Sequence, residues 1–252
     1  MNPQLNIYKP IGKTPLEMIK ILEEKYPEYS NQKISYAGRL DPMAHGVLVL
    51  LVGDSENKQR REREKVDKEY DFKILFGIST DSYDILGIPK SHKDIPNIDE
   101  IEKELKKLIG KYNQKIPTFS SYRIKGKPMY LSAKKGLLEE ENQPKVEREI
   151  FDLKILKYEN ISNTKLLKEI KERIGKIIKP DFRQDIIIPK YEKLLKAQRE
   201  FLLVTIHSHV SSGTYIRSIC DDLGKSLNTG ACAFEILRTR SGIHNLKDSV
   251  YI

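Results

Sequence analysis

The sequence at residues 38–52 is Gly38-Arg39-Leu40-Asp41-Pro42-Met43-Ala44-His45-Gly46-Val47-Leu48-Val49-Leu50-Leu51-Val52. Its apolar end, residues 47–52, is typical of a strand that is buried on both faces. Asp41 lies in the turn before this strand, where glycine and proline restrict the backbone. A carboxylate beside a core costs free energy unless a partner compensates its charge. Asp41 is therefore either an ordinary Asp-Pro turn residue or a nucleophile or general base held in place.

Length, charge and cysteine content narrow the class of protein. The chain has 252 residues, enough for one large or two small domains. Its net charge of +9 favours a polyanionic partner, nucleic acid first and a membrane surface second. Cys220 and Cys232 are too far apart for a redox motif and too few for a disulfide framework. We expect both to be small core residues in a reducing compartment.

No targeting or membrane-spanning signal stands out in the sequence. Residues 1–10 lack the basic and then apolar layout of a signal peptide. The longest apolar run, residues 47–52, is far shorter than a membrane span. We therefore expect a cytoplasmic protein with no membrane contact, in a compartment where soluble RNA or DNA is handled.

Hydrophobic periodicity predicts an α+β fold. Thr14-Pro15-Leu16-Glu17 has the pattern of a capping box with proline at the first helical position, and Pro27 ends that helix. Asn97 caps a second helix, and apolar spacing predicts a third over residues 214–227. Strands are expected at residues 47–52, 70–76, 151–158 and 201–209. This order favours a mixed or antiparallel central sheet flanked by helices, and no glycine-rich phosphate loop supports a doubly wound fold.

Two segments differ from the rest in composition. Residues 111–135 contain no acidic residue; their basic residues are Lys111, Lys115, Arg123, Lys125, Lys127, Lys134 and Lys135, with Tyr112, Phe119, Tyr122 and Tyr130 interleaved. Basic groups bind phosphates and aromatic faces stack on unpaired bases, so this segment predicts an RNA-binding surface. The lysine-rich residues 161–199 predict a helical insertion between two strands. This insertion is either an exposed structural excursion or a second RNA contact.

The motifs of several other chemistries are missing. The sequence has neither a phosphate-binding Walker loop nor the G-x-S-x-G pattern of a serine hydrolase. His207 and His209 share one face of a predicted strand, but no nearby cysteine or aspartate completes a metal site. We therefore predict no metal and no cofactor. The remaining candidate chemistry is a carboxylate, Asp41, acting on a nucleic acid.

Motifs in order over most of the chain resemble those of the TruB-type pseudouridine synthases. The run at residues 38–48 resembles their catalytic G-x-L-D-P-x-A-x-G-x-L motif, and Lys68-Glu69-Tyr70 resembles the start of their next strand. The further matches are at residues 6–14, at 77–87 (G-x-x-T-D-T-x-D-x-x-G in the family), at 116–130, at 212–217 with 221–224 (K-G-T-Y-I-R and D-D-L-G), and at 238–242.

The resemblance implies the pseudouridine synthase fold and the isomerisation of uridine to pseudouridine in RNA, with T-loop uridine 55 of tRNA as the substrate. It implies Asp41 as the nucleophile, Arg217 as the cation that pairs with it, and Tyr70 as the ring that packs on the flipped base and assists proton transfer. No cofactor is needed for this reaction. The candidate substrate-binding residues are Tyr36, Arg39, Arg123, Lys125, Lys127, Tyr130 and Tyr215.

The chain departs from the family pattern near Asp41. Tyr36 stands where histidine is common, and His45 where threonine or arginine is common. Arg39 makes the Gly-Arg-Leu-Asp spelling typical of related enzymes that act on ribosomal RNA. Because the chain ends soon after Gly242, we expect residues 1–252 to be a single catalytic domain without a PUA domain, acting as a monomer with no obligate protein partner. The alternatives are a synthase for another RNA and a catalytically inactive RNA-binding or tRNA-folding protein.

Overall fold

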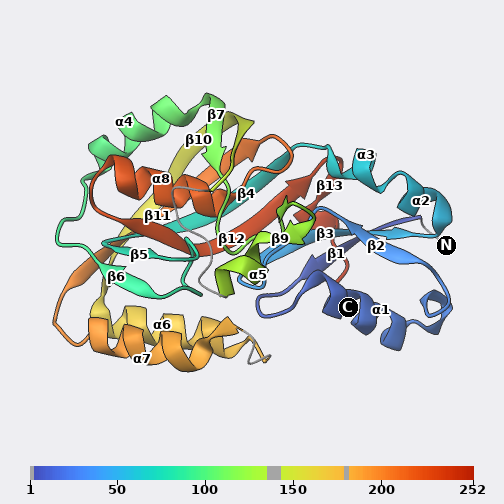
Figure 1. The fold of residues 1–252 in the computed structure, drawn as a ribbon, viewed down its shortest axis with the longest axis horizontal. Coiled ribbons are helices and arrows are strands. Elements are labelled where there is room, and N and C mark those ends of the chain that lie inside the picture. The colour runs from blue at the N-terminus through green and yellow to red at the C-terminus, as the bar shows by residue number, and fades with distance from the viewer. Residues whose placement is uncertain (1–2, 135–142, 179–181) are drawn as a thin grey trace.

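The computed structural model describes residues 3–134, 143–178 and 182–252, which are organised around one large sheet (Figure 1). The strands of this sheet are β1 (Gln4–Lys9), β2 (Ile34–Ala37), β3 (Ala44–Val52), β4 (Lys68–Phe76), β7 (Gly110–Lys115), β10 (Lys145–Ser162), β11 (Glu200–Val210), β12 (Ala231–Ser241) and β13 (His244–Asn245). Their main order is β1-β3-β12-β4-β11-β10-β7, with β2 paired to β3 and β13 to β12.

The sheet is mixed, as predicted. β12 runs parallel to β3, and the other strand pairs of the sheet are antiparallel. Two small hairpins lie apart from it: β5 (Ile78–Thr80) pairs with β6 (Pro89–Ser91), and β8 (Arg123–Ile124) pairs with β9 (Lys127–Pro128). Within the described ranges, no helix is both long and apolar enough to cross a membrane.

The helices are α1 (Pro15–Lys25), α2 (Asp54–Lys58), α3 (Arg60–Glu64), α4 (Ile98–Leu108), α5 (Met129–Lys134), α6 (Asn163–Gly175), α7 (Gln184–Leu194) and α8 (Ile216–Ser226), with short 3-10 turns at Pro27–Tyr29 and Leu246–Asp248. The predicted capping box of Thr14 with Glu17 on α1 and the predicted cap Asn97 on α4 are confirmed, and Asn97 also forms a capping box, with Glu100. In each box the side chains satisfy backbone N–H groups that the first helical turn leaves unpaired.

Helices cover both faces of the sheet (Figure 1), and each face carries a large cluster of buried apolar side chains. On one face α4 and α8 pack Ile101 and Ile219 against strand residues such as Phe72. On the other face α6 and α7 cover the ends of β4, β11 and β12. The buried, apolar sides of these helices supply most of the packing that holds the sheet between them.

The insertion at residues 161–199 is helical, as predicted, and lies between β10 and β11. One of its two expected roles, an exposed excursion, is wrong. Ile170, Ile174, Ile187 and Tyr191 are fully buried against the sheet. The lysines mark only the outer faces of α6 and α7, while the apolar residues between them form core; Pro180 lies outside the described residues.

The basic segment at residues 111–135 divides into different structures. Its start forms β7, where Tyr112 is buried and its hydroxyl donates a hydrogen bond to Asp222. The expectation that Tyr112 stacks on bases is therefore wrong, because its ring faces the core by strand alternation. The β8–β9 hairpin and α5 form the part of the segment outside the central sheet, and Lys135 lies outside the described residues.

Gly46 lets β3 and β12 approach closely, and this contact positions the loop that holds Asp41. A Cβ atom at Gly46 would lie 2.3 Å from the backbone oxygen of Arg238, and its φ of +104° disfavours other residues. The register pairs Gly46 with Arg238, so the arginine side chain is delivered beneath residues 38–41.

Candidate active site

A cleft of about 670 Å³ opens between the Asp41 loop and the start of α8. Most of the predicted site residues line it, namely Tyr36, Arg39, Asp41, Tyr70, Arg123, Tyr130, Tyr215 and Arg217. Lys125 and Lys127 belong to the exposed β8–β9 hairpin and are not among the lining residues. The fold thus gathers side chains from distant parts of the chain around one carboxylate.

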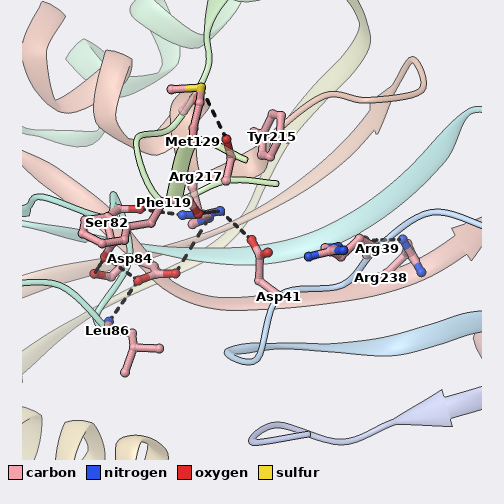
Figure 2. Close-up of polar contacts among 12 residues, drawn as sticks. Arg39, Asp41, Ser82, Asp84, Leu86, Phe119, Met129, Tyr215, Arg217 and Arg238 are labelled. Carbon is pink, nitrogen blue, oxygen red and sulfur yellow. Dashed lines mark hydrogen bonds and ion pairs between the residues drawn. The ribbon is translucent and has the colours of Figure 1, made fainter. Parts of the chain in front are cut away.

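Asp41 and Arg217 face each other in this cleft (Figure 2). The Nη2 atom of Arg217 lies 2.7 Å from the Oδ2 atom of Asp41. The Arg217 side chain is 4% exposed and that of Asp41 is 31% exposed. The carboxylate therefore faces the open cleft, while its cationic partner is fixed behind it and orients it through a charge-assisted hydrogen bond.

Arg217 is held by groups on its far side (Figure 2). It donates hydrogen bonds to the backbone oxygens of Ser82, at 2.8 Å, and Phe119, at 3.2 Å. A second carboxylate, Asp84, lies 3.8 Å from its Nε atom. Asp84 itself accepts hydrogen bonds from the Ser82 hydroxyl, at 2.7 Å, and the Leu86 N–H, at 3.0 Å. Arg217 is thus shared by two carboxylates of different exposure.

The electrostatics of this group favour a charged arginine. Burial alone would lower the pKa of Arg217, but Asp41 and Asp84 together raise it above its ordinary value. Burial raises the pKa of Asp84, and Arg217 opposes that change. The Arg217 guanidinium therefore stays charged although it is buried, because a carboxylate lies on each side of it.

The backbone around Asp41 is fixed from beneath. Arg238, which is 1% exposed, donates to the backbone oxygens of Val47, at 2.7 Å, and of Gly38 and Arg39, both at 3.3 Å. On the other side of Asp41, the N–H of Gly12 donates to the Pro42 oxygen at 2.8 Å. These bonds fix the backbone on both sides of Asp41.

Lys9 is a buried cation close to the same loop. It has no exposed surface, and its Nζ atom donates to the backbone oxygens of Pro10, at 3.0 Å, and Lys13, at 2.7 Å. Burial lowers the pKa of Lys9 to about 7, although the nearby charge of Asp41 acts in the opposite direction. The protonation of this lysine is therefore linked to the stability of the fold.

We expect Lys9 to raise the free energy of unfolding by about 1 kcal/mol between about pH 7 and pH 8. The pKa of Lys9 is about 7 in the folded chain and 10.5 as the unfolded reference, so in this interval the unfolded chain binds more protons. Stability then rises with pH. Denaturant unfolding at several pH values, on the wild type and Lys9→Met, measures this; equal pH slopes for the two proteins would contradict it.

Tyr70 and Tyr215 form walls of the cleft. Tyr70 lies on β4 and is 7% exposed. Burial, followed by the charge of Asp41, raises the pKa of Tyr215, which keeps its phenol neutral. The buried side chain of Gln114 makes two 3.0 Å hydrogen bonds to the backbone of Tyr215, one to the N–H and one to the oxygen. Gln114 thereby fixes the turn that leads into α8 and Arg217.

Sequence reasoning did not single out several residues of the site. Asp84 and Arg238 lie within segments that match the family motifs, at residues 77–87 and 238–242, and this match could have identified them. Gln114 and Arg60 carried no such signal. Their contributions depend on how β7 and α3 pack at the cleft, which no local pattern encodes.

The two strand histidines have carboxylate partners. His207 contacts Asp71 at 2.8 Å, and His209 contacts Asp67. In the parts of the chain that the structure describes, no three or more His, Cys, Asp or Glu side chains gather as a metal site. The shared face of β11 therefore carries two histidine–carboxylate contacts.

Comparison with known proteins matches the sequence to one family. The family described as TruB family pseudouridylate synthase (N terminal domain) matches residues 27–178. The chain belongs to the TruB family. A relative named tRNA pseudouridine synthase B from Protochlamydia amoebophila is 31% identical, over 97% of this chain and 76% of the relative. The protein of the same name from Borreliella burgdorferi is 32% identical, over 98% of this chain and 72% of the relative.

The family membership makes the chain a pseudouridine synthase, as the sequence motifs predicted. Solved structures show the same fold. A Cbf5-Nop10-Gar1 complex matches with a TM-score of 0.60 at 19% identity, over 99% of this chain and 52% of that one. An H/ACA RNP bound to a substrate RNA containing 2'-deoxyuridine matches with a TM-score of 0.57 at 18% identity, over 98% of this chain and 50% of that one. The TruB-family chain spans about half the length of these two proteins.

Proposed function

We propose that this TruB-family chain converts uridine to pseudouridine in tRNA, at uridine 55 of the T loop, with Asp41 as the nucleophile. The observation that carries the proposal is the Asp41 carboxylate, which faces an open cleft and lies 2.7 Å from a buried arginine. The names of the relatives, tRNA pseudouridine synthase B, support the RNA class.

The reaction needs the target base outside its stack. The uridine flips into the cleft, because its reacting atoms are not accessible inside a folded loop. Tyr70 packs on the base there. The Asp41 carboxylate attacks either the base or the sugar, and the bond that it forms breaks again before the product leaves, which restores the free carboxylate. The glycosidic C–N bond breaks, the base turns, and a C–C bond forms in its place. The proton of the new bonding carbon leaves and the freed ring nitrogen gains one, so no redox partner is required; the Tyr70 hydroxyl assists this transfer.

The charge of the cleft suits an RNA backbone. Its lining cations are Arg39, Arg60, Lys68, Arg123, Arg217 and Arg238, and its lining carboxylates are Asp41 and Glu64. Such an excess attracts phosphates and releases their counterions. We assign Arg123 and Tyr130, at the rim, and Lys125 and Lys127, on the adjacent hairpin, to contacts with the RNA that surrounds the flipped base.

Mapping of pseudouridine in a tRNA transcript tests the function. Wild-type protein should produce one new pseudouridine, at uridine 55, and none in a transcript with cytidine at that position. A ribosomal RNA fragment serves as the second substrate. Modification of the ribosomal fragment alone would favour a synthase for another RNA. Binding of the tRNA without any pseudouridine would instead favour an inactive RNA-binding protein.

We further propose that the catalytic unit is a single domain that works as a monomer in the cytoplasm. The support is that the described strands, apart from two small hairpins, belong to one sheet, and that strands of this sheet carry Tyr36, Tyr70 and Arg238 of the cleft lining. Sedimentation at the concentration of the activity assay tests this. A dimer that alone carries the activity would overturn it.

A further inference from the structure

Three side chains meet at one rim of the cleft: Tyr36 near the end of β2, Arg39 in the loop before Asp41, and Arg60 at the start of α3. The Nη2 atom of Arg39 donates a 3.1 Å hydrogen bond to the Tyr36 hydroxyl. The guanidinium of Arg60 lies over the Tyr36 ring, 4.9 Å from its centroid. Because Tyr36 is only 7% exposed, its buried ring is a fixed platform beside the two arginines.

The two arginines are only partly neutralised. The Nε atom of Arg60 pairs with Glu64 at 2.8 Å, and the Arg60 side chain is 42% exposed. Among the described residues, no hydrogen bond engages the Nη atoms of Arg60. Arg39 is exposed, and its side chain donates a hydrogen bond to Tyr36. Two guanidinium groups beside one ring repel each other, and the single carboxylate offsets one charge. An anion between them would relieve the remaining repulsion.

We propose that Arg39 and Arg60 together bind the RNA phosphate next to the flipped uridine, with Tyr36 as the spacer that sets their separation. The proposal rests on the proposed function. Planar guanidinium groups present paired N–H donors that match phosphate oxygens. Arg39 is two residues from Asp41, so a phosphate held there belongs to the target nucleotide or its immediate neighbour.

The burial of Tyr36 argues against a different role for the cluster. A ring that stacks on a base must present a free face. One face of Tyr36 is covered by Arg60, and little of the residue is exposed. Tyr36 therefore acts through the arginines that it orders, as a positioning residue, and the contacts to RNA come from Arg39 and Arg60.

The test compares Arg60→Gln with Arg61→Gln, using a T-arm RNA hairpin as the probe. Arg61 lies on the same helix and is exposed, but it does not line the cleft. We expect Arg60→Gln to weaken binding about tenfold and to reduce the slope of log K against log salt by about one. Arg61→Gln should bind like the wild type.

Glu64→Gln is expected to change the RNA affinity in the opposite direction. The Glu64 carboxylate competes with the RNA phosphate for Arg60, so removal of this carboxylate should tighten binding of the hairpin by about threefold. If the Arg60–Glu64 pair is only structural, both substitutions weaken binding, and the proposal is wrong. It is also wrong if Arg60→Gln and Arg61→Gln are indistinguishable. Failure of the proposed function would appear separately, as wild-type protein that binds the hairpin without forming pseudouridine.

Discussion

Asp41→Asn is expected to lower the single-turnover rate of pseudouridine formation by about four orders of magnitude or more. The amide has nearly the same shape as the carboxylate, and its oxygen still accepts a hydrogen bond from Arg217. It lacks the negative charge that makes a nucleophile. RNA affinity should stay equal or increase, because the substitution removes an anion from a cleft that binds phosphates.

Asp71→Asn is the matched control for this experiment. The Asp71 side chain is 34% exposed, close to the 31% of Asp41, and it also pairs with a basic residue, His207. It projects from β4 on the face opposite to Tyr70, away from the cleft. We expect Asp71→Asn to retain the wild-type rate. A wild-type rate in Asp41→Asn, with intact folding, would overturn the assignment of the nucleophile.

Arg217→Gln is expected to lower the free energy of unfolding by about 3–5 kcal/mol and to abolish most of the activity. The substitution leaves Asp84 buried without the guanidinium that lies 3.8 Å away, and it removes donors from two backbone oxygens. It also removes the group that orients Asp41. Denaturant unfolding and single-turnover assays on the same protein samples measure the two effects.

Addition of Asp84→Asn separates the structural role of Arg217 from its role at Asp41. The double variant no longer buries an unpaired carboxylate, so we expect it to recover a large part of the lost stability. Its activity should stay low, because Asp41 still lacks its partner. If the double variant recovered both stability and activity, Arg217 would act only on the fold. Arg173→Gln, which breaks a pair with Glu235 outside the cleft, is the control and should stay active.

Local patterns predicted much of the fold because the interactions behind them are local. The capping boxes at Thr14 and Asn97 are closed by residues three positions away, so a short window contains the whole signal. The limits of β10 were harder to predict. It extends over Lys145–Ser162, well beyond the expected 151–158, because it pairs first with β7 and then with β11. Partner strands supply the hydrogen bonds that extend it, and these do not appear in its own sequence.

By itself the sequence determined the family and the residue to test first. The glycines and proline around Asp41 and the order of the motifs are properties of the chain, and the turn they form is local. The resemblance already named Arg217 as the partner of that carboxylate. Only the tertiary structure showed the further groups around the pair: Asp84 behind Arg217, Arg238 beneath the Asp41 loop, and Arg60 at the rim. A charge in or near the core is stabilised by whatever packing places beside it, and packing across a sheet joins residues that are far apart in sequence.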